Sequence, residues 1–180
     1  AAVLNLDDEQ IRQVCAQAAQ DQVVEAVNFN APGQIVIAGH KEAVERACEI
    51  AKEAGARRAM LLPVSAPFHS SLLEPAAAIL AQALDTIELH TPRIPVLNNV
   101  DVQMPTDVDA IKSALIRQAW HPVRWVETIQ QMKAYGITHI VECGPGKVLS
   151  GLVKRIDKSI EVFSITDPAS LEQTLTTLKK

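Results

Sequence analysis

Residues 23–38, VVEAVNFNAPGQIVIA, decide the fold expected for the N-terminal third of this chain. They contain two apolar, β-rich runs, residues 23–29 and residues 34–38, separated by the turn-forming pair Pro32-Gly33. Runs of this kind, bounded by such a pair, predict two strands with a short connection. The flanking residues then decide which kind of sheet the two strands join.

Those flanking residues predict two helices and two further strands. Residues 2–6 predict a strand, and Asp7 with Gln10 three residues later predicts a helix N-terminus. The apolar positions of that helix share one face: Ile11, Val14, Cys15 and Ala18. A second helix ends near Gly55, and residues 58–64 predict the last strand. The order β-α-β-β-α-β is that of a ferredoxin-like unit.

The pattern changes after residue 64. We predict helices over residues 71–87, 108–119, 123–135, 148–156 and 171–179, and strands over residues 94–98, 138–143 and 161–165. Strands that alternate with helices favour a parallel sheet with helices packed on it. Such a sheet usually has more strands and both faces covered, so we expect sequence outside this chain to contribute the rest. The predicted fold class is therefore α/β.

The composition is that of a globular protein and argues against several classes of function. Hydrophobic residues make up 48% and charged residues 21% of the chain, and the net charge of −4 gives no support to nucleic-acid binding. No apolar run approaches the roughly 20 residues that span a bilayer. The three cysteines are odd in number and far apart, which fits neither a disulfide framework nor a zinc site. We therefore expect no nucleic-acid partner, no membrane partner, no metal, and a reducing, cytoplasmic location.

His69 is the first candidate for chemistry. It lies in residues 63–71, PVSAPFHSS, where the chain leaves a predicted strand, passes a proline-stiffened loop and enters a helix. Loops at strand ends often carry catalytic groups, and a histidine titrates near neutrality, so His69 suits a general base. The alternative is a capping or surface histidine. No serine of this chain lies in the G-x-S-x-G pattern of a nucleophile elbow.

Three other features have a functional and a structural interpretation. Cys143, at a strand end, is a second candidate nucleophile, but free cysteines are more often small buried apolar residues. Residues 144–147, GPGK, resemble a phosphate-binding loop without its full pattern, and we favour a tight turn. Arg57 and Arg58 form a basic pair that either faces solvent or attracts an acidic partner.

Six segments together resemble the bacterial malonyl-CoA:acyl-carrier-protein transacylases, and they occur in that family's order. They are residues 28–39 (NFNAPGQIVIAG), 64–70 (VSAPFHS), 95–100 (PVLNNV), 117–118 (RQ), 122–125 (PVRW) and 142–149 (ECGPGKVL). The resemblance implies that residues 1–64 form a ferredoxin-like small subdomain. It implies that residues 65–180 form the C-terminal part of an α/β-hydrolase-like large subdomain.

The resemblance also implies a reaction and roles for particular residues. In this family a serine takes malonyl from malonyl-CoA as an ester, and the phosphopantetheine thiol of acyl carrier protein removes it, without a further cofactor. The catalytic histidine matches His69, and the residue whose main-chain carbonyl orients it matches Gln118. Asn30 would lie in the segment beside the acyl pocket. Apart from the resemblance, Phe68 is bulky and next to His69, so we expect it to limit the acyl group to malonyl.

The remaining implications concern the partner and the missing nucleophile. Arg57 and Arg58 match a basic pair expected to meet the acidic carrier protein. The family's G-H-S-x-G-E serine, its malonate-binding arginine and its oxyanion-hole glutamine have no counterpart in this chain. We therefore expect the chain by itself to be inactive. Two alternatives stay open: a non-catalytic module that binds carrier protein, and an acyltransferase domain of a larger synthase.

Overall fold

The computed structural model describes residues 1–179. These residues separate into two compact units, Ala1–Thr128 and the segment that begins at Ile129. These units are defined by compactness and not by the family's subdomains. The predicted subdomain boundary after residue 64 therefore remains a prediction.

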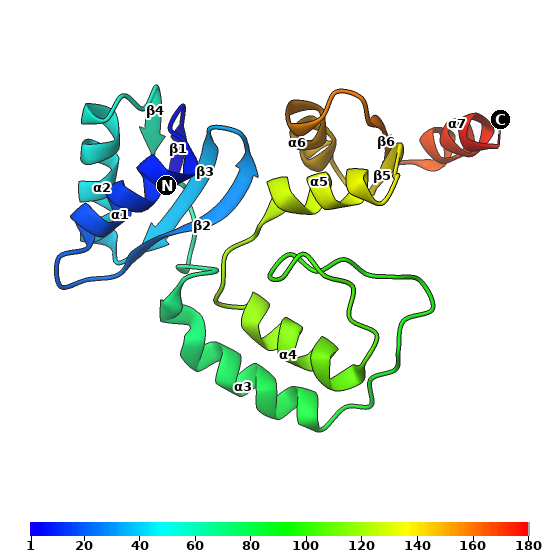
Figure 1. Ribbon diagram of the computed structural model, residues 1–180, viewed down its shortest axis with the longest axis horizontal. Helices are drawn as coiled ribbons and strands as arrows, with labels where there is room; N and C mark the ends of the chain where they lie inside the picture. Colours follow the sequence, from blue (N-terminus) through cyan, green and yellow to red (C-terminus); the bar gives the residue numbers. More distant parts are fainter. Residues whose placement is uncertain (180) are drawn as a thin grey trace. The chain divides into compact units, whose positions relative to one another are not determined.

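The first unit begins with a four-stranded antiparallel sheet in the order β2-β3-β1-β4 (Figure 1). Its strands are β1 (Ala2–Leu4), β2 (Val24–Ala31), β3 (Gln34–Gly39) and β4 (Arg58–Met60). Helices α1 (Asp8–Ala19) and α2 (Lys41–Glu53) connect them and lie side by side on one face of the sheet. This connectivity confirms the predicted ferredoxin-like unit.

The core of this unit lies between the sheet and the two helices. All four apolar positions predicted for α1 are buried, and the Asp7–Gln10 capping box is present in full. The side chains that fill the layer include Val3, Ile11, Ile35, Ile37, Ala43 and Ala47. Burial of one helical stripe and of alternate strand residues supplies most of the stability of such a unit.

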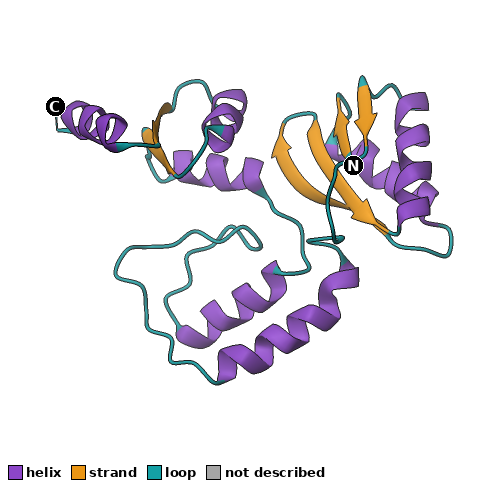
Figure 2. Ribbon diagram, turned by 180° about the vertical axis from the view of Figure 1, so that it is seen from behind, coloured by secondary structure: helices purple, strands orange, loops and turns teal. Residues whose placement is uncertain are grey.

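Two predicted strands are wrong in extent or in kind. The strand predicted over residues 58–64 ends at Met60, and the strand predicted over residues 94–98 is a loop (Figure 2). Both apolar runs contain a proline, Pro63 and Pro95, which has no N–H to donate to a sheet. Apolar composition alone therefore overestimated strand content.

The rest of the first unit is helical. Its elements are a short 3-10 turn η1 (Ser71–Leu73), α3 (Glu74–Asp85) and α4 (Val108–Gln118), and α5 (Trp125–Ala134) begins here and runs into the second unit. Helices α3 and α4 pack on each other, and the long loop between them is drawn in teal in Figure 2. With η1 counted as the first turn of α3, these helices agree with the predicted ones to within about two residues, which is the usual uncertainty of helix ends.

The second unit contains a β-α-β arrangement followed by a helix. Strands β5 (His139–Cys143) and β6 (Glu161–Ile165) pair in parallel, with α6 (Val148–Ile156) between them and α7 (Pro168–Leu178) after them. The strand predicted over residues 138–143 is present as β5, and none of its residues is fully buried. Within the part of the chain that the structure describes, β5 has β6 as its one strand neighbour.

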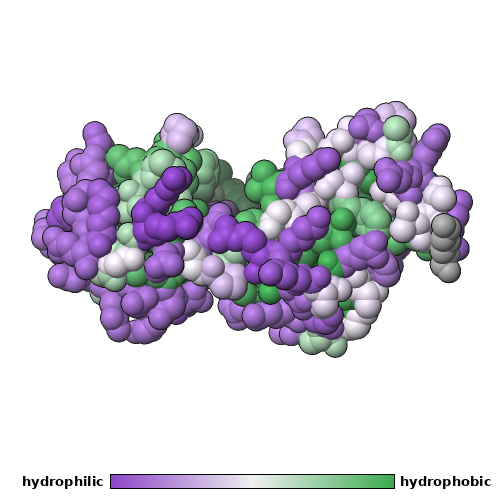
Figure 3. Space-filling view, turned by 90° about the horizontal axis from the view of Figure 1, so that it is seen from above, coloured by the Kyte–Doolittle hydropathy of each residue, from purple (hydrophilic) through white to green (hydrophobic). Residues whose placement is uncertain are grey.

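Large apolar side chains are exposed in both units. Figure 3 shows green apolar atoms reaching the surface between purple polar ones. The most exposed include Val64, Phe68, Ile79, Ile94, Val96 and Val148. Such surface is typical of a contact face, and it fits the expectation that further sequence covers part of this chain. No helix within residues 1–179 is long and apolar enough to cross a membrane.

Gly39 provides a test of the sheet packing. A Cβ atom there would lie 2.1 Å from the carbonyl oxygen of Val23, which is backbone and cannot rotate away. We expect Gly39→Ala to destabilise the protein by about 1–3 kcal/mol or more, because overpacking forces the backbone to shift. Thermal unfolding of the full-length protein measures this. Gly151→Ala is the control: no atom lies within 4 Å of that Cβ position in α6, so it should be neutral or stabilising. Equal melting temperatures for both variants would contradict the packing.

Candidate functional site

His69 lies in the loop between β4 and η1 and is half-buried. Its backbone is in the left-handed region, with φ of +64°. This conformation costs a non-glycine residue about 1 kcal/mol or more, and such strain is concentrated at functional sites. The imidazole Nδ1 lies 2.9 Å from the main-chain carbonyl oxygen of Gln118. The structure thus brings together the two residues that the family resemblance pairs.

That contact fixes the protonation of the ring. A carbonyl oxygen can only accept a hydrogen bond, so Nδ1 of His69 must carry the proton. The neutral ring then has an unprotonated Nε2, which is the form that accepts a proton. Gln118 is the last residue of α4, where carbonyl groups lack intrahelical partners and carry the negative end of the helix dipole. The same carbonyl therefore also stabilises the ring once it is protonated.

The turn that carries His69 is held on its C-terminal side. The hydroxyl of the fully buried Ser70 donates to the carbonyl of Pro67 at 2.7 Å. Ser71 donates from its main-chain N and from its hydroxyl to the Glu25 carboxylate, at 2.8 and 2.9 Å. Since Glu25 belongs to β2, the sheet itself anchors the residues that follow His69.

The segment after Gln118 is attached to the same strand. Val123 donates from its main-chain N to the carbonyl of Val27 at 2.8 Å and accepts from the main-chain N of Phe29 at 3.0 Å. Its position beside Asn28 forms a short parallel bridge on the free edge of β2. Both partners of the His69–Gln118 contact are therefore placed relative to β2.

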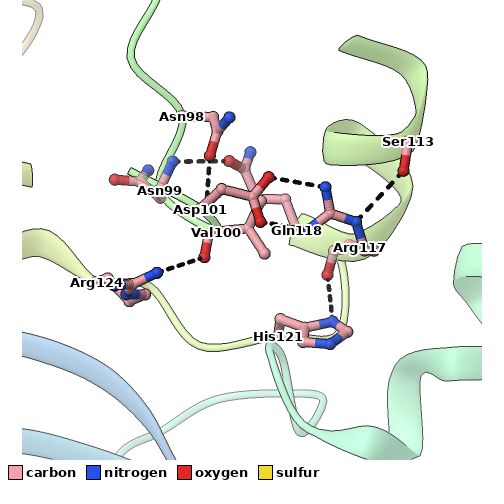
Figure 4. A network of polar contacts seen from close by, with 9 residues as sticks. All are labelled: Asn98, Asn99, Val100, Asp101, Ser113, Arg117, Gln118, His121 and Arg124. Carbon is pink, nitrogen blue, oxygen red and sulfur yellow. Dashed lines mark hydrogen bonds and ion pairs between the residues drawn. The ribbon is translucent and has the colours of Figure 1, made fainter. Parts of the chain in front are cut away.

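A polar network surrounds the end of α4 (Figure 4). The side-chain Oε1 of Gln118 accepts from the main-chain N of Asn99 at 3.2 Å. The guanidinium of Arg117 donates to both carboxylate oxygens of Asp101. This bidentate bond is the main reason that the pKa of Asp101 lies below its usual value. The residues preceding Gln118 and those of the loop before α4 are thus bound to each other.

The other predicted site residues lie apart from this contact. Asn30 is half-buried on β2, and Phe68 is 51% exposed beside His69. Arg57 and Arg58 are exposed at the start of β4, and no side chain within residues 1–179 pairs with either guanidinium. The structure therefore leaves the basic pair accessible to a partner, while it assigns no ligand to Asn30 or Phe68.

No nucleophile is paired with His69 in the described residues. The hydroxyls of Ser70 and Ser71 donate to other groups, as given above. Cys143 belongs to the second unit and is exposed, so the prediction of a small buried cysteine is wrong. Among residues 1–179 there is also no group of three or more residues that could hold a metal ion.

The turn at residues 144–147 is closed to anions by a group of this chain. The Glu142 carboxylate accepts from the main-chain N of Leu149 at 3.1 Å, and from the main-chain N and hydroxyl of Ser150 at 2.7 and 2.6 Å. It thus occupies the N-terminus of α6, which is where a phosphate would bind. The structure favours the tight turn over the phosphate-binding loop.

A cavity of about 430 Å³ opens beside β2, but it does not include His69. Its lining includes Arg12, Glu25, Phe29, Trp120 and His121. Because the proposed base does not face it, cavity size is a poor guide to the site in this chain.

Comparisons with known proteins show the family to which this chain belongs. Residues 1–179 match the family described as "Acyl transferase domain". The chain is 50% identical over 175 residues to the malonyl CoA-acyl carrier protein transacylase of Escherichia coli K12, and 52% identical over 169 residues to that of Haemophilus influenzae. These matches cover 97% and 94% of this chain but 57% and 54% of the relatives, so the chain spans little more than half of their length.

Solved structures give the same result. The chain superposes on the acyl-carrier-protein S-malonyltransferase of Burkholderia pseudomallei with a TM-score of 0.95, at 58% identity, covering 97% of this chain and 57% of that one. It also matches a malonyl-transacylase in complex with a type II polyketide acyl-carrier protein, with a TM-score of 0.96 at 48% identity, covering 98% and 57% of the two chains. These matches confirm the predicted α/β class, with its ferredoxin-like and α/β-hydrolase-like parts.

The sequence did not reveal the residues that support the contact. Glu25 and Asp101 were not singled out, because neither lies in a local pattern with its partner. Ser71 is 46 residues from Glu25, and Arg117 is 16 residues from Asp101. The available signal was weak: Asn98 and Asn99 indicate a turn in front of Asp101, and nothing more.

The Glu142 cap generates a prediction about acid stability. Hydrogen bonds from the Ser150 hydroxyl and from the α6 amides hold the pKa of Glu142 below its usual value. A depressed folded-state pKa stabilises the protein above the unfolded pKa of about 4.3, and this contribution is lost as the pH falls through the folded-state pKa. The melting temperature of Glu142→Gln should therefore lie below that of the wild type near pH 7, and the gap should shrink below about pH 4.

Thermal unfolding of the full-length protein at several pH values measures that gap. Glu172→Gln, at an exposed position in α7, is the matched control and should leave the gap small throughout. A Glu142→Gln gap that does not change with pH would show that the carboxylate charge does not cap α6.

Proposed function

Since this chain belongs to the acyl transferase domain family, we propose that it forms part of a longer enzyme that transfers malonyl from malonyl-CoA to acyl carrier protein. The transfer would serve fatty acid biosynthesis. The names of the relatives, which match this chain along 92–100% of its length, support the substrates. Since the chain spans little more than half of the relatives, the activity is proposed for the longer protein.

One observation carries the proposal: the 2.9 Å contact between His69 Nδ1 and the Gln118 carbonyl oxygen. It leaves Nε2 as the proton acceptor, which is what activation of a hydroxyl nucleophile requires. A histidine with no such partner would populate both neutral tautomers. The strained backbone of His69 supports the same role, because the surrounding hydrogen bonds maintain it against its cost.

The proposed reaction has two halves. A serine from the remaining part of the enzyme attacks the malonyl thioester carbonyl while His69 Nε2 takes the hydroxyl proton. The C–S bond breaks, the coenzyme A thiolate takes that proton, and a malonyl ester remains. In the second half, Nε2 takes the proton of the phosphopantetheine thiol, whose sulfur attacks the ester, and the proton returns to the serine oxygen. The Gln118 carbonyl stabilises the imidazolium in both halves.

The remaining site residues are proposed to set substrate and partner. Phe68, directly before His69, would limit the acyl group by its bulk, and Asn30 would lie at the acyl pocket. Arg57 and Arg58 would attract the acidic carrier protein, since exposed cations steer an oppositely charged partner. A related malonyl-transacylase has been solved with its carrier protein, which supports this kind of partner.

No cofactor is proposed beyond the coenzyme A thioester itself. Acyl exchange between a thioester, a hydroxyl and a thiol moves no electrons between redox states, so nucleophile and base are sufficient. We also propose a cytoplasmic location. The free thiols of Cys15, Cys48 and Cys143 support it, because reducing compartments keep cysteines unpaired.

His69→Ala tests the proposed base. In the full-length enzyme we expect the rate of malonyl-enzyme formation to fall by about 10²–10⁴-fold, because the serine loses its proton acceptor. Intact-protein mass spectrometry after incubation with malonyl-CoA measures the adduct, and a coupled assay measures transfer to carrier protein. His90→Ala is the control, since His90 is exposed, with 78% of its side chain accessible, and its Nε2 lies 3.8 Å from the Glu88 carboxylate.

The outcomes separate the alternatives. Full activity of His69→Ala would exclude the proposed mechanism. A wild-type protein that binds carrier protein but forms no malonyl adduct would support the non-catalytic binding module instead. An adduct on the 180-residue chain alone would reveal a nucleophile within it, and Cys143 would be the first to examine.

A double reversal, Arg57→Glu with Arg58→Glu, tests the carrier-protein surface. We expect the KM for carrier protein to rise about tenfold or more, with the KM for malonyl-CoA unchanged, because only the protein partner meets the basic pair. The difference should shrink at high salt, since both arginines are exposed. Lys154→Glu with Lys158→Glu makes the same charge change elsewhere and should leave both constants unchanged. Equal effects of the two pairs would reject a specific docking site.

A further inference from the structure

The carbonyl group that orients His69 needs support of its own. Gln118 is the last residue of α4, and the final carbonyls of a helix have no intrahelical hydrogen bond. Helix ends fray, so the position of this oxygen is not fixed by the helix alone. A displaced oxygen would release the imidazole, and small displacements of catalytic groups reduce rates strongly.

Arg117 connects the helix end to a fixed loop. Its guanidinium donates to both oxygens of Asp101, at 2.7 Å for Nη2 to Oδ2, and its Nε lies 3.4 Å from the Ser113 hydroxyl (Figure 4). The guanidinium–carboxylate pair is bidentate, which restricts orientation as well as distance. The peptide carbonyl of Arg117 also accepts from His121 Nδ1 at 2.9 Å. The residue next to Gln118 is therefore restrained at both its side chain and its main chain.

Asp101 is itself held in place by its loop. Its main-chain N donates to the Asn98 side chain at 2.7 Å, and the Asn98 main-chain N donates to the Gln103 carbonyl at 3.0 Å, closing a compact turn. Val100 and Val102 are buried on either side of Asp101. The carboxylate therefore projects from a packed turn and not from a mobile surface segment.

A second set of hydrogen bonds, made by Asn99, connects the same turn to the end of α4. The Asn99 main-chain N donates to the Gln118 side chain at 3.2 Å, and the Asn99 carbonyl accepts from the main-chain N of Arg124 at 3.2 Å. Arg124 also donates to the Val100 carbonyl at 3.3 Å. The turn is thus hydrogen-bonded to Arg117 and Gln118 at the end of α4 and to Arg124 after it.

We propose that Asp101 is a positioning residue for His69: through Arg117 it holds the Gln118 carbonyl where it fixes the imidazole tautomer. This inference rests on the proposed function, in which His69 is the base. The pair is about one-third exposed, so it contributes little to global stability, and its effect is on geometry.

Asp101→Asn in the full-length enzyme tests the inference. The amide keeps the shape of the side chain but cannot bind the guanidinium at two acceptor oxygens. We expect the single-turnover rate of malonyl-enzyme formation to fall about tenfold, with the KM for malonyl-CoA within about twofold of the wild type. Asp101→Glu keeps the carboxylate and should retain most of the rate. Asp85→Asn removes a different carboxylate paired with α4, at Lys112, and should have no effect.

An imidazole readout separates positioning from general damage. In ¹⁵N spectra, His69 should be protonated mainly at Nδ1 in the wild type, and the Nε2-protonated form should increase in Asp101→Asn. Wild-type rate and tautomer in that variant would overturn the inference. If Asp101→Asn does not fold, Arg117→Lys serves instead, because lysine cannot make the bidentate bond. The spectrum needs no turnover, so an enzyme that transfers no malonyl would refute the proposed function while this test remains decisive.

Discussion

The free edge of strand β2 is the constraint on which the site depends. One edge of β2 pairs with β3, while its other edge receives Val123 and its Glu25 side chain receives Ser71. An unpaired edge is usually a liability, because its N–H and C=O groups attract other chains. Here two segments that are distant in sequence use it. One follows His69 and the other follows Gln118, so the sheet sets the distance between imidazole and carbonyl.

The two helix ends of interest use the helix dipole in opposite ways. At the N-terminus of α6 the positive end is neutralised internally, because the Glu142 carboxylate occupies its amides. At the C-terminus of α4 the negative end faces the His69 ring, which would become positively charged in the proposed reaction. The first arrangement removes a potential anion site, and the second creates a site for a cation that exists only transiently. The proposed chemistry is therefore concentrated at the C-terminus of α4.

How much the sequence predicted depends on the range of each interaction. The β2–β3 hairpin, the capping box at Asp7 and the helices follow from local patterns, and the structure agrees with them. The strands predicted at Pro63 and Pro95 were wrong, because the apolar residues around each proline were given more weight than its lack of an N–H donor. The pairing of His69 with Gln118 came from the family resemblance, since no periodicity connects residues 49 positions apart. The sequence did not predict the Asp101–Arg117 bond, because it depends on how the loop before α4 folds against the end of that helix.

In the proposed mechanism, the orientation of the base and the supply of the nucleophile fall to different parts of the enzyme. Within residues 1–179 the His69 ring is oriented by its hydrogen bond to the Gln118 carbonyl, and no nucleophile takes part in that contact. Preorganisation of the base therefore does not wait for the serine or the substrate. The serine, in turn, is an ordinary hydroxyl until Nε2 lies within reach of it. Groups that act only as a pair contribute non-additively, so neither part holds a share of the rate by itself. In the proposed enzyme the rate would therefore depend on both groups together, and this chain would contribute the β2 edge, which places His69 and Gln118.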